Sequence, residues 1–72
     1  MKRRELLKLI YRQAGLKGIS NVTLREGGRH SIVTIGNLSL PIPRHREIGD
    51  LLAMQIMKQC EPVFGERWWR ND

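Results

Sequence analysis

The feature that most restricts the fold of this chain is a pair of short β-type segments joined by two residues. Segments 31–35 and 38–42 flank Gly36-Asn37, a dipeptide typical of hairpin turns because glycine adopts positive φ without steric cost. The sequence therefore predicts two antiparallel strands. Because Pro41 lacks an N–H, the second of them should lie at an edge of the sheet or end early, at the next proline.

Another strand and two helices complete the predicted pattern. Residues 19–25 alternate apolar and polar side chains and precede a Gly-Gly pair, which predicts a strand. Helical spacing of apolar residues predicts a helix over 2–14, ended by Gly15, and a second helix over 49–60. The expected buried stripes are Leu6, Leu7, Ile10 and Ala14 in the first helix, and Ile48, Leu51, Leu52, Ile56, Met57 and Cys60 in the second.

The element order is thus helix, three strands, helix, which is an α+β fold with a three-stranded antiparallel sheet. Neither helix can bury its stripe except against the sheet, so we expect both helices on one face and solvent on the other. A chain of 72 residues supports one small core. We expect a single domain over 1–61 and a tail over 62–72, which begins at Pro62. The Trp68-Trp69 pair of this tail should pack back over the core.

The charge balance favours an anionic partner. The chain has 13 Lys and Arg against 7 Asp and Glu, a net charge of +6, and five of the basic residues lie in segment 2–12. Such a surface attracts nucleic acid with an affinity that falls with salt. A single cysteine, Cys60, forms no internal disulfide and favours the cytoplasm. No apolar run approaches the roughly 20 residues of a membrane span.

Two histidines, His30 and His45, are the candidate catalytic side chains. The acids are scattered and show no metal-ligand spacing, so we expect no metal and no cofactor. Histidine exchanges protons near neutral pH, and arginines stabilise charge on phosphate. RNA carries its own nucleophile in the 2′-hydroxyl, so these groups suffice for a metal-independent ribonuclease. A turn residue without a catalytic role is the simpler interpretation of either histidine.

The direction of the His30 side chain depends on which strand face is buried. If Val33 and Ile35 face the helices, His30 points to the open face together with Ile32 and Thr34. If Ile32 faces inward, the assignment reverses. Apolar residues on both faces leave the two alternatives open.

Several features together resemble the HicA family of bacterial type II toxins. They extend from about Lys2 to Cys60 and are the short basic first helix, Gly28-Arg29-His30 at the second strand, Ile42-Pro43 at the end of the third, and Ile56-Met57-Lys58-Gln59 in the last helix. Arg29 stands where the family usually has serine. Gly49-Asp50-Leu51-Leu52 replaces the family's usual Pro-x-Gly-Thr.

The resemblance implies a fold similar to the double-stranded-RNA-binding domain and an endoribonuclease that cleaves mRNA and blocks translation. It implies His30 as the catalytic residue, and a HicB-like antitoxin protein as the partner that covers it. From the charge pattern and the position of the turn, the residues expected to contact RNA are Gly28, Arg29, Arg44, Arg46 and Lys8. A non-catalytic double-stranded-RNA-binding module is the main alternative. A first helix lying on a membrane surface is a third, although that helix lacks tryptophan.

Overall fold

The computed structural model describes residues 1–70 and contains three strands and three helices in this range. In chain order they are α1 (Arg3–Leu16), β1 (Val22–Glu26), β2 (His30–Ile35), β3 (Leu38–Pro43), α2 (Asp50–Gln59) and α3 (Glu61–Phe64). The predicted α+β order is confirmed. The single turn α3 was not predicted, because Pro62 was expected to end helical structure, whereas it lies at the start of a new turn, where its missing N–H costs nothing.

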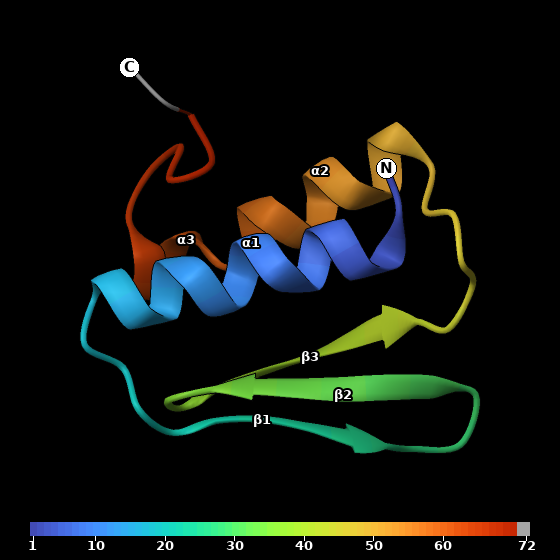
Figure 1. Ribbon diagram of the computed structural model, residues 1–72, viewed down its shortest axis with the longest axis horizontal. Helices are drawn as coiled ribbons and strands as arrows, with labels where there is room; N and C mark the ends of the chain where they lie inside the picture. The colour runs from blue at the N-terminus through green and yellow to red at the C-terminus, as the bar shows by residue number, and fades with distance from the viewer. Residues whose placement is uncertain (71–72) are drawn as a thin grey trace.

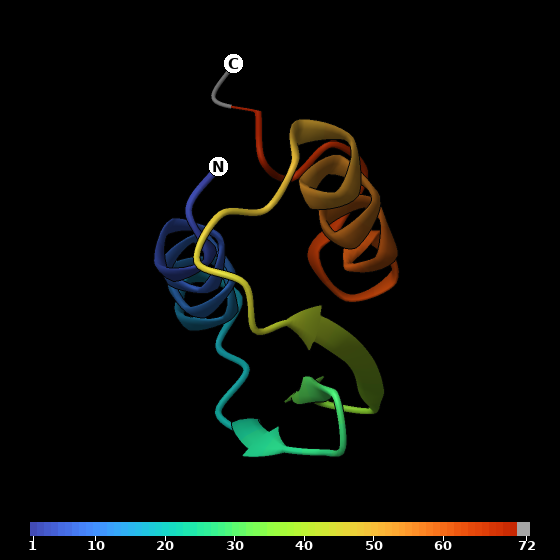
Figure 2. The ribbon, with the colours of Figure 1, turned by 90° about the vertical axis from the view of Figure 1, so that its right-hand side faces the viewer.

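The strands form one antiparallel sheet in the order β1-β2-β3. Leu24 pairs with Val33, and Val33 pairs with Leu40, which places β2 in the centre. The prediction that the proline-containing strand lies at an edge is confirmed. Helices α1 and α2 lie side by side over one face of the sheet and leave the other face open (Figures 1 and 2).

The core lies between the helices and the inner face of the sheet. Val33 and Ile35 of β2 are fully buried, and so is Ile42 of β3. The predicted stripe of α1 is confirmed, since all four of its residues are buried: Leu6, Leu7, Ile10 and Ala14. No helix within residues 1–70 is long and apolar enough to span a bilayer.

The first helix ends later than predicted. Gly15 lies inside α1, and the left-handed residue that ends the helix is Gly18, with φ 70°. The N–H of Gly18 donates to the carbonyl of Gly15 at 3.1 Å, and the N–H of Ile19 donates to the carbonyl of Ala14 at 2.9 Å. These two bonds form a Schellman motif, which satisfies carbonyls that the helix end leaves free.

The predicted buried stripe of α2 is wrong at two positions. Leu51 and Leu52 are 75% and 41% exposed, whereas Ala53 is buried. The prediction counted Ile48 into the helical repeat, but α2 begins at Asp50, so Ile48 does not share the helical phase. Within α2 and its cap the buried residues follow the spacing i, i+3, i+4, i+7 of one helix face, namely Ala53, Ile56, Met57 and Cys60.

The segment after α2 packs against the core, as expected for the tryptophan pair. Phe64 is buried, and the ring of Trp68 meets it edge to face with a centroid distance of 4.9 Å. The indole N–H of Trp68 donates to the carbonyl of Met57 at 2.7 Å. The division of the chain at residue 61 stays a prediction, and the last two residues of the expected tail, 71–72, lie outside the described range.

Candidate nucleic-acid interface

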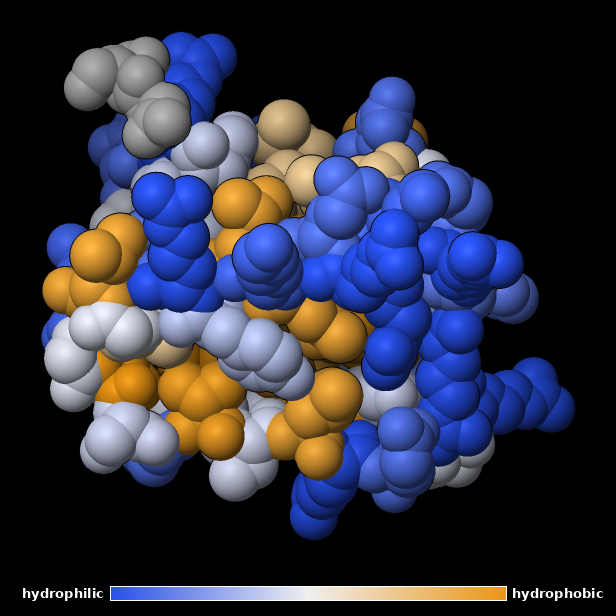
Figure 3. Space-filling model, viewed as in Figure 1, coloured by the Kyte–Doolittle hydropathy of each residue, from blue (hydrophilic) through white to orange (hydrophobic). Residues whose placement is uncertain are grey.

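Five basic side chains gather at the end of the molecule where α1 begins. They line a shallow depression of about 240 Å³, and we name them the basic cluster: Lys2, Arg3, Arg4, Arg44 and Arg46. Backbone pairing joins the two segments that supply them, since the N–H of Arg3 donates to the carbonyl of Arg46 at 2.9 Å. Figure 3 shows hydrophilic residues crowded over this end of the molecule. The arrangement suits a polyanion such as nucleic acid.

Arg3 is fixed in this cluster by hydrogen bonds to two strands. Its Nε donates to the carbonyl of Pro43 and its Nη2 to the hydroxyl of Ser31, both at 2.8 Å. The Ser31 hydroxyl in turn donates to Oε2 of Glu26 at 3.0 Å. Ser31 is fully buried, so the network satisfies a polar group inside the core and anchors α1 to the sheet.

Arg44 connects the cluster to the turn between β1 and β2. Its Nε lies 2.6 Å from Oε2 of Glu26, and its Nη2 donates to the carbonyl of Gly27. The side chain remains 42% exposed, so the ion pair adds little stability. Its consequence is geometric: the turn that carries Gly28, Arg29 and His30 lies next to the cluster.

His30 is the first residue of β2 and is exposed. Val33 and Ile35 are buried, so the first of the two alternatives for this strand is the correct one. Alternation along the strand then places His30 on the open face, together with Ile32 and Thr34. The strand pairs His30 with Pro43, the residue before Arg44.

The open face is less basic than the end of the molecule. Across it the hydroxyls of Thr34 and Ser39 lie 3.0 Å apart, and Arg25 is placed there by its pairing with Ile32. The basic cluster lies instead on the helix side, because Glu26, which binds Arg44, pairs with inward-facing Ser31. His30 and the cluster therefore share one end of the sheet but opposite faces.

Glycines of the β1–β2 turn differ in how tightly they are packed. A Cβ on Gly27 would lie 3.0 Å from the carbonyl oxygen of His30, whereas a Cβ on Gly28 would meet no atom within 4 Å. The N–H of Gly27 also donates to the His30 carbonyl at 2.9 Å. A side chain at position 27 would therefore press on the His30 carbonyl, whereas the predicted RNA contact at Gly28 is an open position on the surface.

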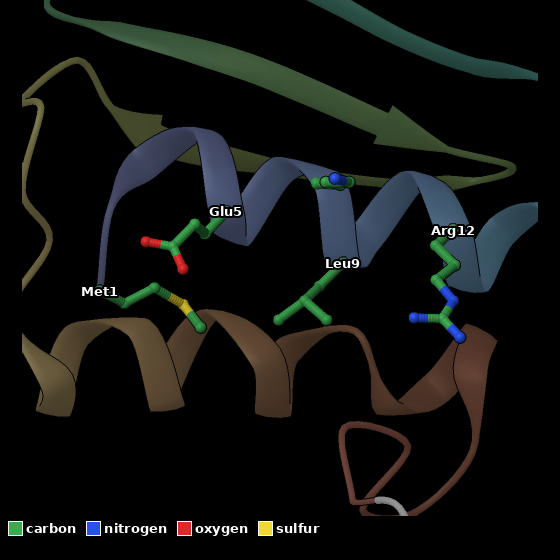
Figure 4. Close-up of a pocket in the computed structure, with 5 residues that line it drawn as sticks. Met1, Glu5, Leu9 and Arg12 are labelled. Carbon is green, nitrogen blue, oxygen red and sulfur yellow. The ribbon is translucent and has the colours of Figure 1, made fainter.

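Lys8, another predicted RNA contact, lies outside the basic cluster. It is exposed on α1, about one turn and a half beyond Arg3. It lines a separate depression of about 280 Å³ between α1 and α2. Figure 4 shows the labelled side chains of this depression, with those of Glu5 and Leu9 extending from α1 toward α2. His45 is exposed in the loop between β3 and α2.

Sequence reasoning missed the residues that hold the cluster together. Arg3 was counted only as one of several charges on the first helix, and Glu26 and Ser31 were given no role. One signal was present in the sequence: Ser31 shares strand parity with Val33 and Ile35, and a hydroxyl at a core position needs a partner.

Two further observations concern ligands and relatives. Within residues 1–70 no group of three His, Cys, Asp or Glu side chains gathers closely enough to hold a metal ion. Comparison of the chain with models of protein families, with curated proteins and with solved structures finds no match. The functional argument therefore rests on the fold, the cluster and the turn beside it.

Proposed function

We propose that this protein is a metal-independent endoribonuclease that cleaves mRNA, with His30 as its catalytic residue. The observation that carries the proposal is the exposed position of His30 on a turn that Arg44 joins to the basic cluster. A proton-transfer group and a phosphate-binding surface then lie at the same end of the molecule. The order of elements, α1-β1-β2-β3-α2, also agrees with a fold like that of the double-stranded-RNA-binding domain.

The proposed reaction uses the 2′-hydroxyl of RNA as the nucleophile. This oxygen attacks the adjacent phosphorus, the bond from phosphorus to the 5′-oxygen breaks, and the products are a 2′,3′-cyclic phosphate and a 5′-hydroxyl. His30 either takes the proton from the 2′-hydroxyl or gives one to the leaving 5′-oxygen, and solvent water makes the other proton transfer. Arg29, the residue before His30, offsets the charge that develops on the phosphate oxygens, and the basic cluster binds the RNA backbone farther along the RNA strand.

The biological role follows from the resemblance to HicA toxins. In this proposal the protein acts in the cytoplasm, blocks translation by cutting mRNA and arrests growth. A HicB-like antitoxin holds it inactive by covering His30. The exposure of His30 leaves room for such a partner, and no membrane is involved.

Cleavage of a labelled mRNA in EDTA tests the proposal. His30→Ala should slow cutting by about 10² to 10⁴ if His30 transfers a proton, with little change in RNA affinity. His45→Ala is the matched control, because His45 is an exposed loop histidine and its loss should leave the rate unchanged. Circular dichroism spectra establish that all three proteins are equally folded. Equal cutting by the His30 and His45 variants would contradict the assignment.

A non-catalytic double-stranded-RNA-binding module is the second candidate. It is favoured by the placement of the cluster on the helix side, whereas His30 lies on the opposite face of the sheet. The same assay separates the two functions. If wild type does not cut the mRNA but binds a duplex RNA with strong salt dependence, the chain is a binding module.

A further inference from the structure

The two edges of the sheet differ in their free hydrogen-bonding groups. The N–H of Gly36 donates to the carbonyl of Asn21 at 3.0 Å, and the N–H of Gly27 donates to the carbonyl of His30 at 2.9 Å. These two hydrogen-bonded pairs lie at the two ends of the β1–β2 pairing. Bonded pairs alternate along an antiparallel ladder. Residues 23 and 25 of β1 therefore bond to β2, and the N–H and C=O groups of residues 22 and 24 point away from the sheet.

The outer edge of β3 lacks most of its donors. The same alternation turns Ser39, Pro41 and Pro43 outward, and the two prolines have no N–H. This edge therefore resists the addition of another strand. On β1, by contrast, no backbone hydrogen bond within residues 1–70 engages the outward groups of Val22 or Leu24.

A shallow groove runs beside the open edge, between α1 and β1. It has a volume of about 620 Å³, and Leu7, Tyr11 and Leu24 supply its apolar surface. Its other lining residues are cations of α1, namely Arg4, Lys8 and Arg12. Figure 3 shows hydrophobic side chains below a row of hydrophilic ones in this region. Tyr11 and Leu24 are 42% and 38% exposed, so they are available to a ligand.

We propose that the free edge of β1 binds an acidic partner protein, which adds an extended segment to the sheet as a fourth strand. The backbone groups of Val22 and Leu24 supply the ladder bonds, the groove takes apolar side chains, and the cations select carboxylates. This inference does not depend on the ribonuclease proposal.

The observations favour this occupant over two others. A second copy of the chain would bring two proteins of net charge +6 together at a basic edge. RNA would engage the cations and could stack on Tyr11, but an edge of alternating N–H and C=O groups matches the backbone of a peptide and not that of a polynucleotide. An acidic peptide in extended conformation matches all three features.

An NMR titration of the ¹⁵N-labelled full chain tests the proposal. The probe is the capped seven-residue peptide Val-Thr-Glu-Thr-Val-Thr-Glu, whose Val and Glu side chains share one face of an extended strand, and the control is the same peptide with Lys in place of Glu. The Glu peptide should shift the amide signals of residues 22–26, slow hydrogen exchange at Val22 and Leu24, and leave 38–43 unchanged. The Lys peptide should bind at least about tenfold more weakly, because it meets like charges.

Two sets of variants locate the interaction. Leu24→Pro removes an outward N–H without removing a bond to β2, so it should abolish peptide binding, whereas Leu24→Ala should retain part of it. Lys8→Glu combined with Arg12→Glu should lower affinity for the Glu peptide at least about tenfold. If Leu24→Pro does not fold, the double variant at Lys8 and Arg12 still tests the proposal. Both of these side chains are exposed, so their replacement should not unfold the chain.

Four results would overturn the proposal. They are the absence of Glu-peptide shifts at 22–26, equal binding of both peptides, shifts at 22–26 that grow with protein concentration alone, and displacement of the peptide by a single-stranded RNA that moves the same amide signals. The third result would assign the edge to a second copy of the chain, and the fourth to nucleic acid.

Discussion

The guanidinium of Arg3 donates a hydrogen bond to the buried hydroxyl of Ser31 at 2.8 Å, across 28 positions of sequence. This contact joins the first turn of α1 to the central strand. Through Glu26 the same hydroxyl is coupled to Arg44, and thus to the turn before His30. One buried oxygen therefore connects the basic cluster with the strand that carries the proposed catalytic residue.

Replacing Ser31 with alanine should destabilise the fold. The change leaves Nη2 of the half-buried Arg3 without its acceptor and removes one of the two partners of Glu26, which costs roughly 1 to 3 kcal/mol of unfolding free energy. Urea unfolding measures this loss of unfolding free energy. Ser39→Ala is the matched control, since its hydroxyl bonds only Thr34 on the exposed face, and should cost less than about 0.5 kcal/mol. Equal losses in the two variants would show that the Ser31 network stabilises the fold no more than the exposed hydroxyl pair does.

The two glycines of the β1–β2 turn should respond differently to alanine. Gly28→Ala should be neutral or stabilise by about 0.4 to 1 kcal/mol, because its Cβ enters open space and the unfolded chain loses freedom. Gly27→Ala should destabilise relative to Gly28→Ala, because its Cβ presses on the His30 carbonyl. Thermal unfolding of both variants checks this order of stability. The proposed ribonuclease activity should be lost in Gly27→Ala alone. A more stable Gly27→Ala would contradict the close packing.

Loss of one cation from the cluster should weaken RNA binding and reduce its salt dependence. For Arg46→Ala we expect the slope of log affinity against log salt to fall in magnitude by about 1. Fluorescence anisotropy of a labelled RNA at several salt concentrations measures the slope. Lys58→Ala removes the same charge from α2, outside the cluster, and should leave the slope nearly unchanged. Identical slopes for both variants would place the RNA elsewhere.

Burial of Cys60 should make stability fall at high pH. Desolvation raises the pKa of its thiol from 9.0 to about 11. Between these values the unfolded chain loses the thiol proton while the folded chain keeps it, so the free energy of unfolding decreases as pH rises. The stabilisation is fully present below pH 9 and is lost as pH approaches 11. Urea unfolding under reducing conditions should show a steeper decline for wild type than for Cys60→Ala, and parallel curves would contradict the assignment.

Local patterns in the sequence were sufficient for the three strands and the two longer helices, although not for the single turn α3. The Gly36-Asn37 turn and the alternation around it predicted the hairpin, and Pro41 placed β3 at an edge. These features act over a few residues, through allowed backbone angles and missing donors, so they need no knowledge of the rest of the chain.

Only the tertiary structure decided which faces of α2 and β2 are buried and which distant residues meet. Leu51 and Leu52 are as apolar as the core, yet they are exposed because the docking of α2 turns Ala53 inward. The direction of His30 followed once Val33 and Ile35 were seen to be buried. The basic cluster arises because the start of α1 pairs with the segment after β3, and the sequence contains the charges but not this pairing. Spacing along a chain determines periodicity, whereas the phase of each helix and the contacts between its ends depend on how the whole core packs.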